Sequence, residues 1–137
     1  MTANQYLTQL RTVDAEIESL IDEKAALESK LVRGTQSITG MPRGGSHDSQ
    51  NAIIAVAEAA ARIDEKIAEL CRLKAEAHAV IDMVDRGDLR QVLQLRYVNC
   101  LSWSRVARRM HYDERQVYRL YKLALRAVEE ILGNRGS

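Results

Sequence analysis

Apolar residues recur at alternating intervals of three and four positions along the first part of the chain. The series is Tyr6, Leu10, Val13, Ile17, Leu20, Leu27 and Leu31, and Lys24 is its one break. This spacing predicts a long helix with a narrow apolar seam of the coiled-coil kind. Thr2 and Gln5 have the spacing of a capping box, which places the helix start near residue 2. Gly34 is expected to end the helix.

A second seam of the same kind occupies residues 49–86. It consists of Ile53, Val56, Ala60, Ile63, Ile67, Leu70, Ala77, Ile81 and Val84, and Lys74 is its break. The two helices are long enough to pack together as an antiparallel hairpin. Between them, residues 34–48 hold four of the seven glycines and the only proline, so a flexible loop is expected there.

Three shorter helices are predicted in the last part of the chain. Gly87 is expected to end the second long helix, and Asp88 to begin the third. Ser102 and Asp113 are residue types that cap helix N-termini, and each precedes an amphipathic stretch. Gly133 is expected to stop the last helix. The apolar faces are Leu89, Val92, Leu93 and Tyr97; then Trp103, Val106, Ala107 and Met110; then Val117, Leu120, Tyr121, Ala124, Leu125, Val128 and Leu132.

These elements predict an all-α protein with two domains. Residues 1–86 would form a long antiparallel helical hairpin, a coiled coil, and residues 87–137 a three-helix domain of the helix-turn-helix type. Cys71 and Cys100 do not have the spacing of metal ligands, and we expect both to be reduced and at least partly buried. No apolar run has the length of a membrane span, so we expect a cytoplasmic protein without a membrane partner.

The formal net charge of +1 conceals an uneven distribution. Residues 1–87 carry ten basic and fourteen acidic groups, whereas residues 88–137 carry ten basic and five acidic groups. Seven of those basic groups and two acids fall within residues 104–126. Such an asymmetry is typical of proteins that bind nucleic acid. A solvated helical face is the alternative, but the basic residues lie inside a helix-turn-helix pattern, which favours double-stranded DNA.

The helix-turn-helix pattern assigns a role to each exposed basic residue. The second helix of this motif lies in the major groove with its N-terminal residues against the bases, and the first crosses the backbone. The predicted base contacts are Arg115, Gln116, Tyr118, Arg119 and Lys122, and the predicted phosphate contacts are Arg105, Arg108, Arg109 and Arg126. Glu114 either accepts a hydrogen bond from cytosine or complements the helix dipole. Tyr118 either contacts DNA or is a surface aromatic, and Trp103 is expected to be structural.

The stretch from Leu89 to Leu132 resembles region 4 of sigma-70-type factors and the related output domains of response regulators. The shared pattern is Leu95-Arg96-Tyr97, Ser102, Val106-Ala107, Asp113, Val117 and Ala124. The chain departs from this pattern at Arg105, where Glu is usual, at His111, where Gly is frequent, and at Leu123, where Arg is frequent. Histidine tolerates a positive φ better than most side chains, so the turn is expected to be retained. The family's contact at the position of Arg105 stays open.

The whole chain also resembles a family of small proteins from Gram-positive phages and prophages, similar to the ArpU and RinA kind of phage late-gene regulators. The resemblance rests on Tyr6-Leu7, Leu10-Arg11, residues 14–17, the glycine loop, residues 63–67, Arg96-Tyr97 and Ser102-Trp103. It implies a sequence-specific, duplex-DNA-binding regulator of phage transcription.

Two other functions stay open from the sequence. One is the DNA-recognition small subunit of a phage packaging terminase, and the other is an adaptor that binds host RNA polymerase. For the regulator, a homo-oligomer is expected, with a dimer favoured, because Ile54 and residues 57–61 leave apolar surface beside the seam. A ring of eight or more copies would favour the packaging subunit, and a monomer the adaptor. The three histidines are scattered and no phosphate loop or nucleophile elbow occurs, so no enzyme, metal or cofactor is expected.

Overall fold

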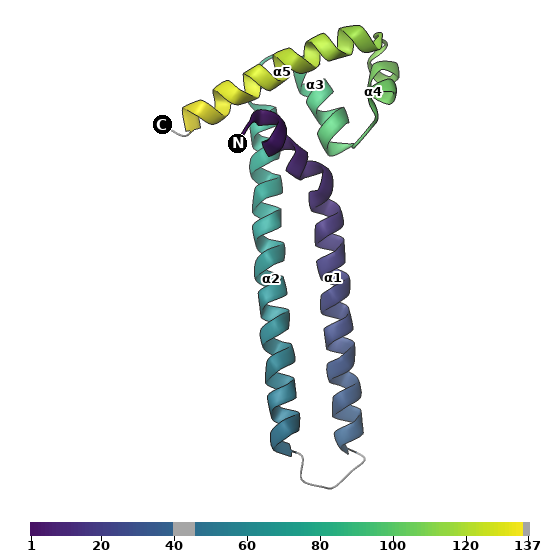
Figure 1. Cartoon of the computed structure of the whole chain (residues 1–137), viewed down its shortest axis with the longest axis vertical. Coiled ribbons are helices and arrows are strands. Elements are labelled where there is room, and N and C mark those ends of the chain that lie inside the picture. The colour runs from purple at the N-terminus through teal and green to yellow at the C-terminus, as the bar shows by residue number, and fades with distance from the viewer. Residues whose placement is uncertain (40–45, 136–137) are drawn as a thin grey trace. The chain divides into compact units, whose positions relative to one another are not determined.

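Helices joined by short connections make up the described part of the chain. A computed structural model describes the backbone of residues 1–39 and 46–135, and the side chains of residues 1–33 and 50–135. The elements in order are α1 (Ala3–Thr39), α2 (Ser46–Asp82), α3 (Gly87–Leu93), the π-helical turn η1 (Gln94–Val98), α4 (Trp103–Met110) and α5 (Glu114–Arg135) (Figure 1). No strand occurs in these ranges, which confirms the all-α class. None of the described helices has the length and hydropathy that crossing a membrane requires.

Contacts between residues divide the chain into two compact units. Unit 1 comprises Met1–Asp14 and Arg72–Ser137, and unit 2 comprises Ala15–Cys71. Both long helices contribute to both units. The boundary at residue 86 suggested by the sequence lies inside unit 1, where Asn4 of α1 bonds to Tyr97 of η1 and Tyr121 of α5.

In unit 2, α1 and α2 lie side by side and run in opposite directions (Figure 1). Ile63 is buried, and the other seam residues that are half-buried are Ile17, Leu20, Leu27, Leu31, Val56, Ala60, Ile67 and Leu70. Ile53, also predicted in the seam, is exposed. Lys24, the break in the seam of α1, donates to Asp64 Oδ1 at 2.9 Å. The lysine is thus paired across the two helices, and this hydrogen bond raises the pKa of Lys24.

Unit 1 contains most of the buried side chains. Those with the least exposure include Leu7 and Val13 of α1, Val80 and Ile81 of α2, Val84, Val92 and Leu93 of the next segment, and Val106, Val117 and Val128. The predicted seams omit Leu7 and Val80. A helix that packs against more than one neighbour buries a wider stripe than a coiled-coil seam does. Lys74, the break in the seam of α2, donates to Asp14 Oδ1 at 2.7 Å.

Three predicted helix ends, each placed at a glycine, are wrong. α1 continues through Gly34 to Thr39, α5 continues through Gly133 to Arg135, and Gly87 begins α3. A glycine inside a helix costs only about 1 kcal/mol relative to alanine, and no described glycine has a positive φ. The loop predicted at residues 34–48 is helical at 34–39 and 46–48, and its remainder lies outside the described residues.

An arginine of α3 binds the segment that follows α2. Arg90 Nη1 donates to the carbonyl oxygens of Val84 at 2.6 Å and Asp85 at 2.9 Å. Carbonyl groups beyond the last turn of a helix have no helical partner, and the guanidinium group supplies one. α2 ends four residues earlier than the sequence predicts, and Arg90 is occupied within the fold by the segment that follows it.

Hydrogen bonds connect the two chain segments that make up unit 1. They involve Asn4, Tyr97 and Tyr121. The Tyr97 hydroxyl lies 2.8 Å from Asn4 Oδ1 and 2.8 Å from the Tyr121 hydroxyl, and the Tyr121 hydroxyl donates to Asn4 Oδ1 at 3.1 Å. The predicted capping box, with its bonds of 2.9 and 3.2 Å between Thr2 and Gln5, holds the turn that carries Asn4. Burial and the bond to Tyr121 raise the pKa of Tyr97.

Candidate nucleic-acid interface

Two side-chain caps and one tight turn set the positions of α4 and α5. Each helix has a cap at its N-terminus, and the turn joins the end of α4 to the start of α5. Ser102 Oγ accepts from the Arg105 amide at 3.3 Å, and Asp113 Oδ1 accepts from the Gln116 amide at 2.7 Å. Both predicted caps are therefore confirmed. Between them, His111 ends α4 in the left-handed conformation with φ 61° and ψ 37°. The amide of Tyr112 then bonds to the Ala107 carbonyl at 3.0 Å, which closes the helix end.

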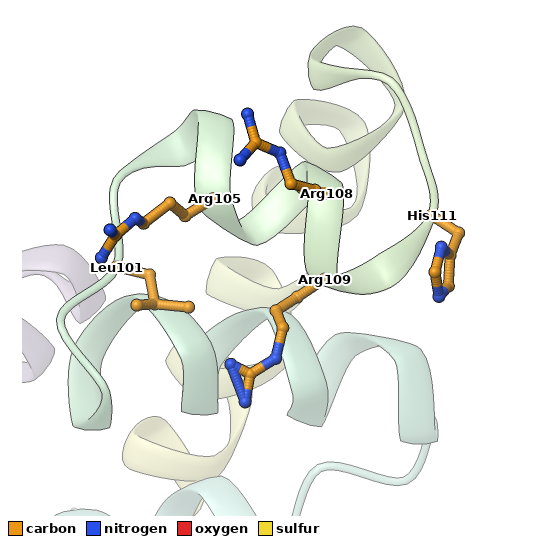
Figure 2. Close-up of a pocket in the computed structure, with 5 residues that line it drawn as sticks. All are labelled: Leu101, Arg105, Arg108, Arg109 and His111. Atoms are coloured by element: carbon orange, nitrogen blue, oxygen red, sulfur yellow. The ribbon is translucent and has the colours of Figure 1, made fainter.

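α4 buries one face and presents arginines on the other. Val106, Ala107 and Met110 are buried as predicted, whereas Arg105, Arg108 and Arg109 are exposed. The three arginines line a pocket of about 450 Å³ together with Leu101 and His111. Figure 2 shows the guanidinium groups spreading from α4 in different directions, with Arg105 beside Leu101. Such an arrangement can meet several phosphates along a strand, because each arginine reaches a different point.

α5 divides in the same way along its length. Val117, Leu120, Ala124 and Val128 are buried, and the exposed face carries Glu114, Arg115, Gln116, Tyr118, Arg119, Lys122 and Arg126. All nine residues proposed to contact DNA from the sequence are therefore exposed side chains of α4 and α5. Within the described parts of the chain, none of their basic groups forms a salt bridge.

Another basic residue of the same region is engaged in the fold. Arg96 Nη1 donates to the Leu101 carbonyl at 3.0 Å, and its guanidinium carbon lies 4.5 Å from the centre of the Trp103 ring. Together with Arg90, it is thus occupied by carbonyl and aromatic partners. The sequence shows both as ordinary basic residues, and only the tertiary contacts separate them from the exposed ones.

Trp103 has a more limited structural role than predicted. Its ring contacts Tyr121 edge-on at a centroid distance of 4.6 Å, but the side chain is only half-buried. It lines a second pocket, of about 360 Å³, together with Glu114, Arg115 and Tyr118. Sequence reasoning missed this pocket, since its walls come from the first turns of two different helices.

Comparison with known protein families assigns the chain by its C-terminal two thirds. Residues 42–130 match the model of a family described as "Protein of unknown function (DUF722)". The chain belongs to this family. No curated protein and no solved structure matches it. The DUF722 match includes the whole of α3 and α4 and all nine residues proposed to contact DNA.

The cysteines of this DUF722 protein differ from the prediction. Cys71 and Cys100 are both free, but both are exposed, whereas the sequence suggested at least partial burial. Cys71 follows Leu70 of the seam and turns away from it. Cys100 has a φ of 57°, which carries the chain out of η1. Among the side chains of residues 1–33 and 50–135, no three of His, Cys, Asp or Glu come close enough to hold a metal ion.

Proposed function

We propose that this protein binds double-stranded DNA in a sequence-specific manner, with α4 and α5 acting as a helix-turn-helix. The observation that carries this proposal is the set of exposed basic side chains on α4 and α5 that have no acidic partner among the described residues. Unpaired arginines and lysines on one motif attract phosphates and release their counterions. The capped α4, the left-handed residue His111 and the capped α5 match the local geometry of that motif.

The two helices divide the work of recognition in this proposal. Arg105, Arg108 and Arg109 of α4, with Arg126 of α5, contact phosphates. The first turns of α5 present Arg115, Gln116, Tyr118, Arg119 and Lys122 to the major groove. Arginine pairs well with guanine and glutamine with adenine, each through two hydrogen bonds. This function requires no catalytic residue, metal or cofactor.

The biological role that we propose is phage transcriptional regulation in the host cytoplasm. Its support is the resemblance of residues 89–132 to region 4 of sigma-70-type factors, and of the whole chain to ArpU- and RinA-type regulators. The confirmed caps at Ser102 and Asp113 and the positive φ of His111 are features that this resemblance predicts. The pairing of α1 with α2 completes the proposed arrangement, a helical hairpin followed by a three-helix domain.

The salt dependence of DNA binding tests this function directly. If about five phosphates are contacted, the slope of log K against log salt concentration is about −4.5. Fluorescence anisotropy of a labelled duplex measures the slope with the full-length protein. Arg108→Ala should reduce its magnitude by about 0.9, whereas Arg62→Ala, which removes an exposed arginine of α2, should leave it unchanged. Absence of binding at low salt, or a flat slope, would refute DNA binding.

A further inference from the structure

The pocket between the first turns of α4 and α5 has walls unlike the rest of the basic surface. Two aromatic rings, Trp103 and Tyr118, form it together with the side chains of Glu114 and Arg115. Trp103 is the first residue of α4, and Glu114 is the first residue of α5. In the proposed function, the N-terminal turn of α5 is the part that meets base edges. The pocket therefore opens where bases would lie.

Both rings are held in position before any ligand binds. Trp103 has the Arg96 guanidinium carbon 4.5 Å from its ring centre and contacts the Tyr121 ring at a centroid distance of 4.6 Å. Tyr118 has Lys122 Nζ 4.9 Å from its centre on one side and the Tyr121 ring at a centroid distance of 6.2 Å. Side chains that are already ordered lose little entropy on binding. The exposed fraction of Tyr118, 52%, is then available to a ligand.

The charged groups of the pocket lining balance one another. Glu114 contributes a carboxylate and Arg115 a guanidinium group, so this lining does not have the net positive charge of the α4 pocket, which would attract a phosphate. The arginines of α4 line the other pocket, so this one suits an apolar group with a base edge beside it. The major-groove edges of the four bases carry a single apolar group, the C5-methyl group of thymine.

From this geometry we propose that the Trp103–Tyr118 pocket receives the methyl-bearing edge of a thymine, and so contributes to sequence specificity. The inference rests on the proposed DNA binding. Burial of one methyl group contributes roughly 0.8 kcal/mol, which corresponds to about a fourfold change in affinity. Glu114, part of the pocket lining, can accept a hydrogen bond from the amino group of an adjacent base.

Replacement of thymidine by deoxyuridine removes the C5-methyl group and changes nothing else in the base. The full-length protein is first used to select its preferred duplex from random sequence, and each thymine of that duplex is then replaced in turn. At one thymine contacted by each bound chain, the replacement should weaken binding by about fourfold. Tyr118→Ala should abolish this difference at that position, and Tyr118→Phe should preserve it because the ring remains. Tyr112→Ala, at an exposed tyrosine outside the pocket, is the matched control and should also preserve it.

The possible results separate this inference from the proposed function. A selected duplex whose thymines all tolerate replacement, or which contains none, would overturn the pocket assignment while leaving DNA binding intact. Retention of the fourfold difference in Tyr118→Ala would also overturn it. Loss of the fourfold difference in Tyr118→Phe would also contradict the proposal, because it would show that the Tyr118 hydroxyl group, and not its ring, distinguishes thymine from uracil. A protein that selects no duplex at low salt would overturn both the function and the inference.

Discussion

Gln116 and Arg119 are the side chains on which base recognition depends in the proposed function. Both are exposed within the first two turns of α5, next to the buried Val117 and Leu120 that anchor the helix. Replacing either by alanine should weaken binding to the preferred duplex by roughly 1–3 kcal/mol, because two hydrogen bonds to a base are lost. Binding to random DNA should change much less. Titration of both duplexes by anisotropy gives the two values.

Arg108→Ala is the control for that comparison, since it removes a predicted phosphate contact on α4. It should weaken binding to the preferred and the random duplex by similar amounts, because phosphates carry no sequence information. If Gln116→Ala and Arg119→Ala behave in the same way as Arg108→Ala, these two residues contact the backbone and the bases are read elsewhere.

The hydroxyl group of Tyr97 connects the two chain segments of unit 1. Tyr97→Phe keeps the ring and removes the bonds to Asn4 and Tyr121, both of 2.8 Å. Each such hydrogen bond contributes about 0.5–1.5 kcal/mol, so the loss of two should lower the free energy of unfolding by about 1–3 kcal/mol. Tyr112→Phe, which alters an exposed hydroxyl in the turn, should leave it unchanged. Urea titration followed by circular dichroism measures both, and equal values would show that the bonds contribute nothing.

The raised pKa of Tyr97 also predicts a loss of stability in alkali. Burial is the main cause and the hydrogen bond to Tyr121 the second, and burial raises the pKa of Tyr6 as well. Above about pH 10 a tyrosine of the unfolded chain loses its proton while the folded state keeps it. The unfolded state then binds fewer protons, so stability falls by up to about 1.4 kcal/mol per pH unit per group. The fall should be shallower in Tyr97→Phe, and an identical pH profile would contradict this account.

Among the elements, α5 has a shorter cap hydrogen bond than α4. The Asp113 carboxylate accepts from the Gln116 amide at 2.7 Å, compared with 3.3 Å for the Ser102 bond in α4. Asp113→Ala should lower the free energy of unfolding by about 1 kcal/mol. Asp113→Asn keeps an acceptor oxygen and should retain most of the stability. If Asn is as damaging as Ala in thermal melts, the carboxylate charge rather than the cap is what stabilises α5.

The predicted elements differ in how far local sequence decides them. Caps were predictable at Thr2, Ser102 and Asp113, because a side chain three residues from its amide partner makes a local bond. Ends placed at Gly34 and Gly133 were wrong, because a helix with tertiary partners tolerates glycine. The π-helical turn η1, in which the Asn99 amide bonds to the Gln94 carbonyl at 3.0 Å, was not predicted. The apolar pattern that ends at Tyr97 is compatible with an ordinary α-helix, so the sequence gives no sign of the wider turn.

The candidate site follows a similar rule. Amphipathic spacing was enough to predict which side chains of α5 are exposed, since burial of Val117, Leu120 and Ala124 leaves the opposite face open. It could not separate Arg96 from Arg105, because the ring under Arg96 belongs to another element. The Trp103–Tyr118 pocket was equally hidden, since residues fifteen positions apart in sequence form its walls only once the turn at His111 has closed.

At the scale of the whole molecule, the hairpin helices leave apolar surface that the chain itself does not cover. In unit 2 the exposed side chains include Ile21 at 52%, Val32 at 55% and Ile54 at 53%. Ile21 and Ile54 each follow a seam position by one residue. In an antiparallel pair, residues one position after the seam of each helix face the same side, so these apolar side chains and Ala57 and Ala61 share one face. A second copy of the chain fits the proposed function, because two half-sites give tighter specificity than one.

That face should hold two chains together in solution. Light scattering of the full-length protein at micromolar concentration should give about twice the 15.5 kDa of one chain. Ile54→Lys should weaken the dimer by at least about tenfold, because a buried isoleucine contributes roughly 1.5–3 kcal/mol. Ala55→Lys is the matched control: it adds the same charge at the adjacent exposed position, which faces away from that side.

A monomeric wild-type protein would contradict the dimer and favour an adaptor of RNA polymerase, whereas a closed ring of many copies would favour a packaging subunit. Equal weakening by both lysines would place the contact on another face of the hairpin.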